Sequence, residues 1–325
     1  MISRMDRKLV FGTNSTWHDW VNQPTSWDDL MFQKMAAANS QSLLSGYGWD
    51  VVEPNPHQNG QHTYLFGELD RRVDLALKYN IEFTFTIVAT PDWANPNPPG
   101  QNAFKLPLDA YEQDFRSFCT TLAQRYLGKV RYFEFWNEPD GAGMQFDVVT
   151  YTRWLRPCYE AVKAGNPNAL VSVGGLVNAD VGFLWRIYNN GGRPYFDAVA
   201  VHPYGTGIGP IDFESIDLKH DEMDSRGDGA KSIWLTEYGW RLNGVTEQQQ
   251  SDWLAQSLQQ LWTYSYNYVT QASYNLIADK ITAPAEKSGL TDGNLNARIA
   301  YNTFRDFAAP RTPRWESKAP ALSAV

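Results

Sequence analysis

The sequence has little of what disulfide-rich or zinc-binding proteins need. It contains two cysteines, Cys119 and Cys158, no Cys-x-x-Cys pair and five histidines. A disulfide framework or a structural zinc site requires several such residues at close spacing, so we expect neither. Each cysteine lies in the middle of a segment with the apolar periodicity of an amphipathic helix, which predicts a small buried side chain.

The chain also lacks a long apolar run and an excess of positive charge. No stretch is long enough to cross a membrane or to act as a secretory signal. The formal net charge is -8 at pH 7, and a field of that sign repels phosphate backbones and anionic membranes. We therefore expect no nucleic-acid or membrane partner. The expected location is the cytoplasm, or the outside of the cell after removal of a signal, and the oligomeric state stays open.

Aromatic residues, by contrast, are abundant. They make up 14% of the chain and include 13 Trp and 17 Tyr. Their rings combine an apolar face with a polar edge, which suits the C–H faces and hydroxyl groups of sugars, although the same residues also fill ordinary cores. The 325 residues, 43% of them hydrophobic, are enough to bury one large core. These features favour a single domain with a carbohydrate partner.

Short apolar runs alternate with longer segments of helical periodicity along the chain. This alternation predicts repeated βα units around a parallel sheet. We count eight units, which predicts an α/β protein with one (β/α)8 TIM-barrel domain over residues 1–309 and an irregular tail over 310–325. The predicted strands cover residues 8–12, 42–46, 81–88, 130–135, 169–174, 198–202, 232–236 and 268–274.

Local signals indicate where several helices begin and where the longer loops lie. Glycine and proline cluster in residues 95–100 and 205–210, after the third and sixth predicted strands. In a TIM barrel this rim, at the C-terminal ends of the strands, carries the active site. Three pairs of residues fit or approximate the spacing of a capping box, which marks a helix start. The pairs are Ser26 with Asp29, Asp109 with Glu112, and Thr246 with Gln249.

Two glutamates stand at the ends of predicted strands on opposite sides of this rim. Glu138 follows the fourth strand, directly before Pro139, and Glu237 follows the seventh. Glycosidic cleavage uses two such carboxyl groups, one to protonate the leaving oxygen and one to attack the anomeric carbon. Either glutamate alone could instead cap a helix or pair with a surface lysine. Together they predict the active site of a glycoside hydrolase.

Six short motifs lie at or near the ends of predicted strands or before the last helix. They are Thr90-Pro91-Asp92-Trp93-Ala94, Asn137-Glu138-Pro139, Gly174-Gly175, His202-Pro203-Tyr204, Thr236-Glu237-Tyr238-Gly239 and Gly289-Leu290. This set resembles clan A of the glycoside hydrolases, whose catalytic acids lie on strands four and seven. From about Phe11 to Phe307 the chain is most similar to the family 39 type, which includes β-xylosidases, α-L-iduronidases and some endo-acting exopolysaccharide hydrolases.

The resemblance implies a role for each carboxyl group. Glu138 would be the acid/base and Glu237 the nucleophile of a double displacement that retains the anomeric configuration, with no metal or organic cofactor. The two carboxyl groups would then lie about 5 to 5.5 Å apart. We expect the pKa of Glu138 to be raised by its apolar neighbours Phe135 and Trp136 and by the charge of Glu237.

The same resemblance implies a binding site for an oligo- or polysaccharide, with a xyloside-like or exopolysaccharide substrate. Asn137 would hydrogen-bond the hydroxyl at carbon two of the reacting sugar, a contact that strengthens in the transition state. Tyr204 would donate its phenolic proton to Glu237, and His202 would lie in the same layer unless it is an ordinary core histidine. The other candidates for substrate contact are Trp93, Trp136, Trp240, Tyr274 and His18, of which Trp93 and Trp240 could equally be loop packing.

Two positions depart from the clan pattern. Many members carry an arginine at the end of the second strand, where this chain has Leu44, so another group must hold Glu237. Many also have a tryptophan near the end of the eighth strand, for which Tyr274 could substitute. These departures keep a second hypothesis open, a non-catalytic carbohydrate-binding barrel. A metal-dependent hydrolase, the third hypothesis, would need paired histidines at the strand ends, which are missing here.

Overall fold

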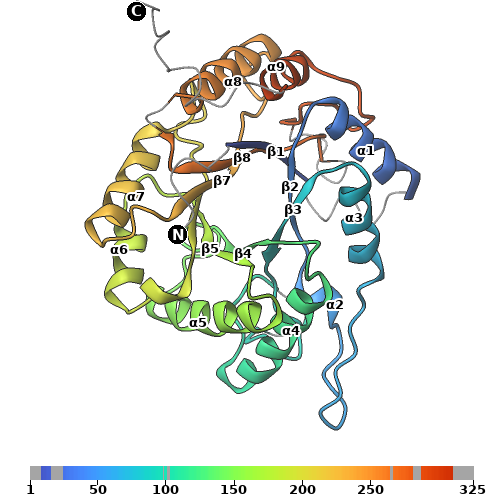
Figure 1. Ribbon diagram of the computed structural model, residues 1–325, viewed down its shortest axis with the longest axis vertical. Helices are drawn as coiled ribbons and strands as arrows, with labels where there is room; N and C mark the ends of the chain where they lie inside the picture. The colour runs from blue at the N-terminus through green and yellow to red at the C-terminus, as the bar shows by residue number, and fades with distance from the viewer. Residues whose placement is uncertain are drawn as a thin grey trace, which may run out of the picture.

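The structure, a computed structural model, describes residues 9–15, 25–97, 99–100, 103–263, 266–280 and 287–309. Within them, eight parallel strands close into a barrel in which each strand pairs with its sequence neighbours and β8 pairs with β1 (Figure 1). The predicted (β/α)8 TIM-barrel fold is confirmed. The strands are β1 (Val10–Asn14), β2 (Ser42–Gly46), β3 (Glu82–Ile87), β4 (Tyr132–Asn137), β5 (Leu170–Leu176), β6 (Ala198–Val201), β7 (Ser232–Tyr238) and β8 (Val269–Tyr274).

A ring of helices surrounds the barrel, as the view along its axis in Figure 1 shows. The helices are α1 (Thr25–Ala37), α2 (Trp49–Val52), α3 (Gly67–Lys78), α4 (Glu112–Arg125), α5 (Val148–Gly165), α6 (Gly182–Asn189), α7 (Phe213–Ser225), α8 (Glu247–Leu261) and α9 (Ile299–Ala308), with the 3₁₀ helices η3 (Asp109–Tyr111) and η4 (Arg193–Tyr195). None of these helices is long and apolar enough to cross a membrane. The predicted tail, residues 310–325, lies outside the described residues.

The strand boundaries agree with the predicted ones to within two residues, and those of β2 are as predicted. β1 begins and ends two residues later than expected, and β4, β5 and β7 each continue two residues beyond the expected end. Apolar periodicity locates the buried middle of a strand and carries little information about its last paired residue. As a result, Asn137 and Glu237 belong to strands rather than to the loops that follow them.

One of the three predicted capping boxes is present. At the start of α8, Thr246 accepts a hydrogen bond from the backbone N–H of Gln249, whose side chain bonds back to the N–H of Thr246. The prediction at Asp109 is wrong, because that residue begins η3 instead of capping α4. The prediction at Ser26 is also wrong, because α1 already begins at Thr25.

Apolar side chains fill the space between the barrel and its helices. Phe135 on β4 packs against Phe115 of α4 and Tyr151 of α5, with ring centroids 6.2 and 5.2 Å apart. The two cysteines lie buried in the same pair of helices as free thiols, as predicted. This packing fixes the outward face of β4 and so determines which of its side chains point into the barrel.

The interior of the barrel below the active rim is polar. Gln271 on β8 donates to the hydroxyl of Thr84 on β3 at 2.9 Å. One layer nearer the C-terminal rim, Glu134 accepts hydrogen bonds from Thr86 and Thr236. Branched aliphatic side chains fill the interior of most TIM barrels. In this barrel, hydrogen-bonded polar side chains lead up to the rim instead.

Candidate active site

A cavity of about 1030 Å³ opens at the C-terminal ends of the strands. That volume is at the upper end of the range for small-molecule sites. The strand ends contribute a floor that is mostly polar, and the loops after β6 and β7 contribute the walls. The lining includes Asn14, Leu44, Thr86, Asn137, Glu138, Glu237 and Asn275 at the strand ends and residues 204–208, 239–241 and 243–245 in the loops.

Asn137 and Glu138 are neighbours in the sequence, yet both line the cavity. In a regular strand, two consecutive side chains point to opposite faces. The backbone departs from that geometry here, because Trp136 and Glu138 have φ angles of 69° and 45°, which non-glycine residues rarely adopt. This conformation brings both polar side chains to the cavity and leaves Trp136 packed against Phe135 and Phe146.

Glu237 is held by two neutral hydrogen-bond donors. The hydroxyl of Tyr204 donates to Oε2 at 2.8 Å, as predicted, and the side-chain amide of Asn275 donates to the same oxygen at 2.9 Å. Asn275 also donates to the Tyr204 hydroxyl at 2.5 Å. We did not predict Asn275, which directly follows β8. It takes over the support of Glu237, while Leu44 adds only apolar lining.

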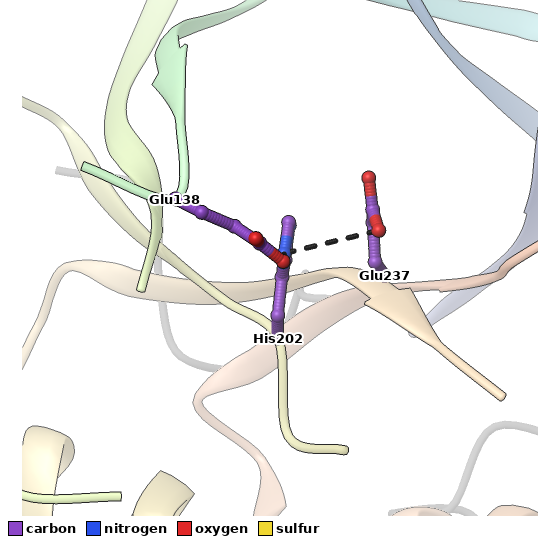
Figure 2. Close-up of side chains that lie close together, drawn as sticks. All are labelled: Glu138, His202 and Glu237. Carbon is purple, nitrogen blue, oxygen red and sulfur yellow. Dashed lines mark hydrogen bonds and ion pairs between the residues drawn. The ribbon is translucent and has the colours of Figure 1, made fainter. Parts of the chain in front are cut away.

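Glu138 is held by a histidine. His202 directly follows β6, and its side chain is fully buried at 0% exposure. Its Nδ1 lies 2.9 Å from Oε1 of Glu138 and 3.9 Å from Oε2 of Glu237, so the ring stands between the two carboxyl groups (Figure 2). Its Nε2 lies 3.1 Å from the hydroxyl oxygen of Thr236. Gly175 on β5 leaves room for the ring, since a Cβ there would come within 2.0 Å of Nε2.

The charges around this ring shift two pKa values. Burial lowers the pKa of His202, but the charge of Glu237 and the hydrogen bond and charge of Glu138 outweigh it and raise the pKa to about 9. Burial acts to raise the pKa of Glu138, yet the hydrogen bond and positive charge of His202 hold it below its usual value. The expected raised pKa of Glu138 is therefore wrong, because a charged donor beside the carboxylate outweighs its apolar neighbours.

Glu134 is a third carboxyl group in this region, and we did not predict it. The residue lies inside the barrel with 1% exposure. Its Oε1 accepts from the hydroxyl of Thr236 at 2.9 Å and its Oε2 from that of Thr86 at 3.2 Å. Burial raises the pKa of Glu134 to about 7 against the lowering effects of His202 and of these hydrogen bonds. Glu134 is thus linked to His202 through one hydroxyl group.

Among the described residues, one group of three acidic, histidine or cysteine side chains is compact enough to share a metal ion. It consists of Glu138, His202 and Glu237, and one ligand atom from each lies within 4.8 Å of the others. A metal ion bound there would have to displace the hydrogen bond between His202 and Glu138. The same distance brings an oxygen of Glu138 within 4.8 Å of an oxygen of Glu237.

The aromatic residues predicted to contact sugar have different surroundings. Trp240 contributes to the cavity lining, although it is only 2% exposed, and its Nε1 donates to the carbonyl oxygen of Gly209 at 2.8 Å. It therefore ties the loop after β6 to the end of β7. His18 lies outside the described residues.

Three other aromatic residues are not part of the lining. Trp136 and Tyr274 are 1% and 0% exposed, and the hydroxyl of Tyr274 donates to the carbonyl oxygen of Ser288 at 3.1 Å. The predictions of sugar contact for these two residues are wrong, because protein atoms enclose both rings. Trp93 is half-buried, and its Nε1 donates to the carbonyl oxygen of Glu53 at 3.0 Å. It packs the loop after β3, which was the alternative for this residue.

A (β/α)8 barrel with two close carboxyl groups at its C-terminal rim has the architecture of a glycoside hydrolase. The family model for the glycosyl hydrolase catalytic core matches residues 110–301 of the chain. The chain belongs to this family, and the predicted membership of the glycoside hydrolases is confirmed. No curated protein sequence matches the chain.

Solved structures with a similar fold include several glycoside hydrolases. A family 39 glycoside hydrolase from Bacteroides cellulosilyticus WH2 matches with a TM-score of 0.74 and 19% identity over 95% of this chain and 65% of that chain. A monomeric β-xylosidase from Caulobacter crescentus CB15 matches with a TM-score of 0.74 and 17% identity over 94% and 68%. An exo-β-1,4-mannosidase from Opitutaceae bacterium strain TAV5 matches with a TM-score of 0.71 and 15% identity over 95% and 61%. The chain thus spans less than two thirds of the first and third proteins, and at these identities the similarity is one of fold.

Proposed function

We propose that the protein is a retaining glycoside hydrolase that acts by double displacement, with Glu138 as the acid/base and Glu237 as the nucleophile. The observation that carries the proposal is the convergence of the two side chains, of which one oxygen each lies within 4.8 Å. Retaining enzymes hold these carboxyl groups about 5 to 5.5 Å apart, whereas inverting enzymes leave about 6.5 to 9.5 Å for a water molecule. The short separation supports direct attack by a carboxylate.

In the first half-reaction Glu237 attacks the anomeric carbon and forms a glycosyl ester. The hydrogen bonds from Tyr204 and Asn275 to Oε2 orient the carboxylate with Oε1 as the attacking oxygen. The leaving oxygen receives a proton from Glu138 as the glycosidic bond breaks. The leaving group departs as a neutral alcohol.

In the second half-reaction a water molecule attacks the same anomeric carbon. Glu138, now a carboxylate, takes a proton from this water, and the ester bond to Glu237 breaks. Two inversions at one carbon give net retention. Asn137, which lines the cavity beside Glu138, hydrogen-bonds the hydroxyl at carbon two in both transition states, where the contact is strongest.

We further propose a xyloside-like or exopolysaccharide substrate. The fold similarity to the Caulobacter crescentus β-xylosidase supports a pentoside as the first candidate. The cavity of about 1030 Å³ is at the top of the range for drug-sized ligands, which suits more than one sugar ring. Aryl glycosides and polysaccharides, with pentosides and uronides first, form the panel that tests this choice.

The stereochemistry of hydrolysis tests the mechanism. Proton NMR during the first turnovers on the best substrate of the panel should detect the product anomer with the configuration of the substrate. Formation of the opposite anomer first would contradict double displacement. Activity that is unchanged by a chelator supports chemistry without a metal ion, and loss of activity with recovery on adding a divalent cation would favour the metal-dependent alternative.

Azide rescue assigns the two carboxyl groups. With an activated aryl glycoside, Glu237→Ala should yield a glycosyl azide of inverted configuration, and Glu138→Ala one of retained configuration. Glu214→Ala, which removes an exposed carboxylate on α7, is the matched control and should hydrolyse the glycoside like the wild type. A non-catalytic carbohydrate-binding barrel would hydrolyse nothing as wild type and form no azide with either variant.

A further inference from the structure

The contact between His202 and Glu138 requires a proton. Nδ1 and Oε1 lie 2.9 Å apart, which is the distance of a hydrogen bond between a nitrogen and an oxygen. A deprotonated Nδ1 and a deprotonated carboxylate would instead direct two lone pairs at each other. One proton therefore lies between the two atoms, shared by an imidazolium with a carboxylate or by a neutral imidazole with a carboxylic acid.

The other nitrogen of His202 is fixed by hydrogen bonds that end on Glu134. Burial raises the pKa of Glu134 to about 7, so this carboxyl group is ionised above neutral pH, and there Thr236 donates its one hydroxyl proton to Oε1 at 2.9 Å. Thr236 can therefore only accept from His202, so Nε2 carries a proton and donates it at 3.1 Å. Thr86 donates to the second oxygen of Glu134 at 3.2 Å, which keeps both oxygens of that carboxylate as acceptors. Nδ1 is thus the nitrogen of the ring that exchanges a proton with the cavity.

The surroundings of the ring favour its charged form. The side chain of His202 is fully buried, and carboxyl groups act on it from two strands. Glu134 and Glu138 belong to the β4 segment, and Glu237 belongs to β7. The phenol ring of Tyr204 packs edge-on at a centroid distance of 6.2 Å. A buried histidine that donates from both nitrogens and lies among carboxylates is stabilised as the imidazolium.

We propose that His202 stores the proton that Glu138 delivers to the leaving group, and that Glu134 is a positioning residue that keeps this proton on Nδ1 through Thr236. The inference rests on the proposed function, because it names the source of the proton that the acid/base transfers. It also explains how a carboxylate held beside a cation can serve as an acid. Glu138 has to carry the proton only while the glycosidic bond breaks.

The protons balance over one catalytic cycle. In the first half-reaction Nδ1 gives its proton to Glu138, which passes it to the leaving oxygen, while Glu237 becomes a neutral ester. His202 then faces one negative charge fewer, which favours its neutral form. In the second half-reaction the attacking water gives a proton to Glu138, which returns it to Nδ1, while the ester breaks and Glu237 regains its charge.

Nitrogen-15 NMR of the histidine side chains tests the proton store without any substrate. The signals of His202 are assigned by their loss in His202→Gln. In the wild type both ring nitrogens should be protonated at pH 7. In Glu134→Gln, which keeps a hydrogen-bonding group but removes the charge, the titration midpoint should fall by roughly one pH unit. A His202 that is neutral at pH 7, or a midpoint that Glu134→Gln leaves unchanged, overturns the proposal.

Thr236 provides a matched pair of variants for the same titration. Thr236→Val removes the hydroxyl at nearly constant volume and should lower the midpoint of His202, because Nε2 loses its acceptor. Thr236→Ser keeps the hydroxyl and should restore the wild-type midpoint. A serine variant that titrates like the valine variant would mean that packing, and not the hydrogen bond to Glu134, controls the charge of His202.

Two leaving groups separate proton delivery from general damage to the site. Phenyl xyloside needs a proton on its leaving oxygen, whereas 2,4-dinitrophenyl xyloside does not. A His202 midpoint that is lower by about one pH unit removes the stored proton only at alkaline pH. Glu134→Gln and Thr236→Val should therefore move the alkaline fall of kcat/KM for the phenyl substrate to lower pH, a loss of up to roughly tenfold at alkaline pH, and should change kcat/KM for the dinitrophenyl substrate less than about threefold. An equal loss on both overturns the proposal while leaving the proposed function intact. If the wild type cleaves no glycoside of the panel, the proposed function fails and the NMR titration still decides where the proton lies.

Discussion

Glu138 and Glu237 face the same cavity but are held by different chemistry. Glu138 lies 2.9 Å from Nδ1 of a histidine, whereas Glu237 accepts hydrogen bonds from a phenol and an amide. Burial and the charge of Glu237 raise the pKa of Tyr204 well above its usual value, so neither neutral donor has a proton to exchange near pH 7. The comparison teaches that two identical side chains can be given different chemistry by their partners, which is what the proposed roles of acid/base and nucleophile require.

Replacing either carboxylate should have the largest effect and tests whether Glu138 and Glu237 have different roles. Glu237→Gln should lower kcat/KM at least roughly 10³-fold for every leaving group, because no ester can form. Glu138→Gln should lower it about 10²- to 10⁴-fold for phenyl glycosides and far less for 2,4-dinitrophenyl glycosides. Steady-state kinetics with both substrates measures the difference. If both variants depend on the leaving group in the same way, the two roles are not divided between these residues.

Two substitutions change the surroundings of Glu237 and of Glu138 separately. Asn275→Ala removes one donor to Glu237 and should lower kcat/KM about 10-fold for good and poor leaving groups alike. Gly175→Ala places a methyl group against the ring of His202 and should slow poor leaving groups about 10- to 100-fold. Thermal unfolding of both variants controls for loss of fold. If Asn275→Ala slowed only poor leaving groups and Gly175→Ala slowed all of them, the assignment of these partners to Glu237 and Glu138 would be wrong.

The raised pKa of His202 makes the difference in kcat/KM between poor and good leaving groups depend on pH. Because this pKa is raised to about 9, the proton shared with Glu138 is present at neutral pH and is lost as the pH rises through about 9. The value of kcat/KM for phenyl glycosides should therefore fall on the alkaline side, while that for 2,4-dinitrophenyl glycosides holds. A second ionisation should appear on the acid side, since the nucleophile must be ionised. A phenyl-glycoside profile without an alkaline limb would exclude His202 as the proton store.

The fold could be predicted because each strand has a buried apolar core that periodicity detects. What periodicity could not predict is the backbone at the strand ends. The left-handed conformations of Trp136 and Glu138 and the continuation of β7 through Glu237 depend on packing between strands that are distant in the sequence. The burial of Trp136 and Tyr274 follows from the same cause, because an aromatic residue at a strand end can face the cavity or the protein.

The site was predictable where a motif carried it and not where a contact between distant segments did. Glu138, Glu237 and Tyr204 came from strand-end motifs, and the bond from Tyr204 to Glu237 is present. The pKa of Glu138 was mispredicted because its main partner stands 64 positions away. Asn275 and Glu134 were missed, although each left a signal in the sequence. The first is a polar residue directly after the eighth strand, and the second an acid inside the fourth.

The smallest expected effect comes from a charge that acts on Glu138 more weakly than His202 does. Lys280 lines the cavity and lowers the pKa of Glu138 through its charge, as the weakest of four influences. Lys280→Gln should change kcat/KM for phenyl glycosides by less than about threefold at low ionic strength. At about 1 M salt the Debye length falls to about 3 Å, so wild type and variant should converge. A difference that persists at high salt would mean that Lys280 contacts the substrate. Convergence would leave His202 as the group that makes Glu138 differ from Glu237, since the side chain of His202 is fully buried and salt screens buried charges much less than exposed ones.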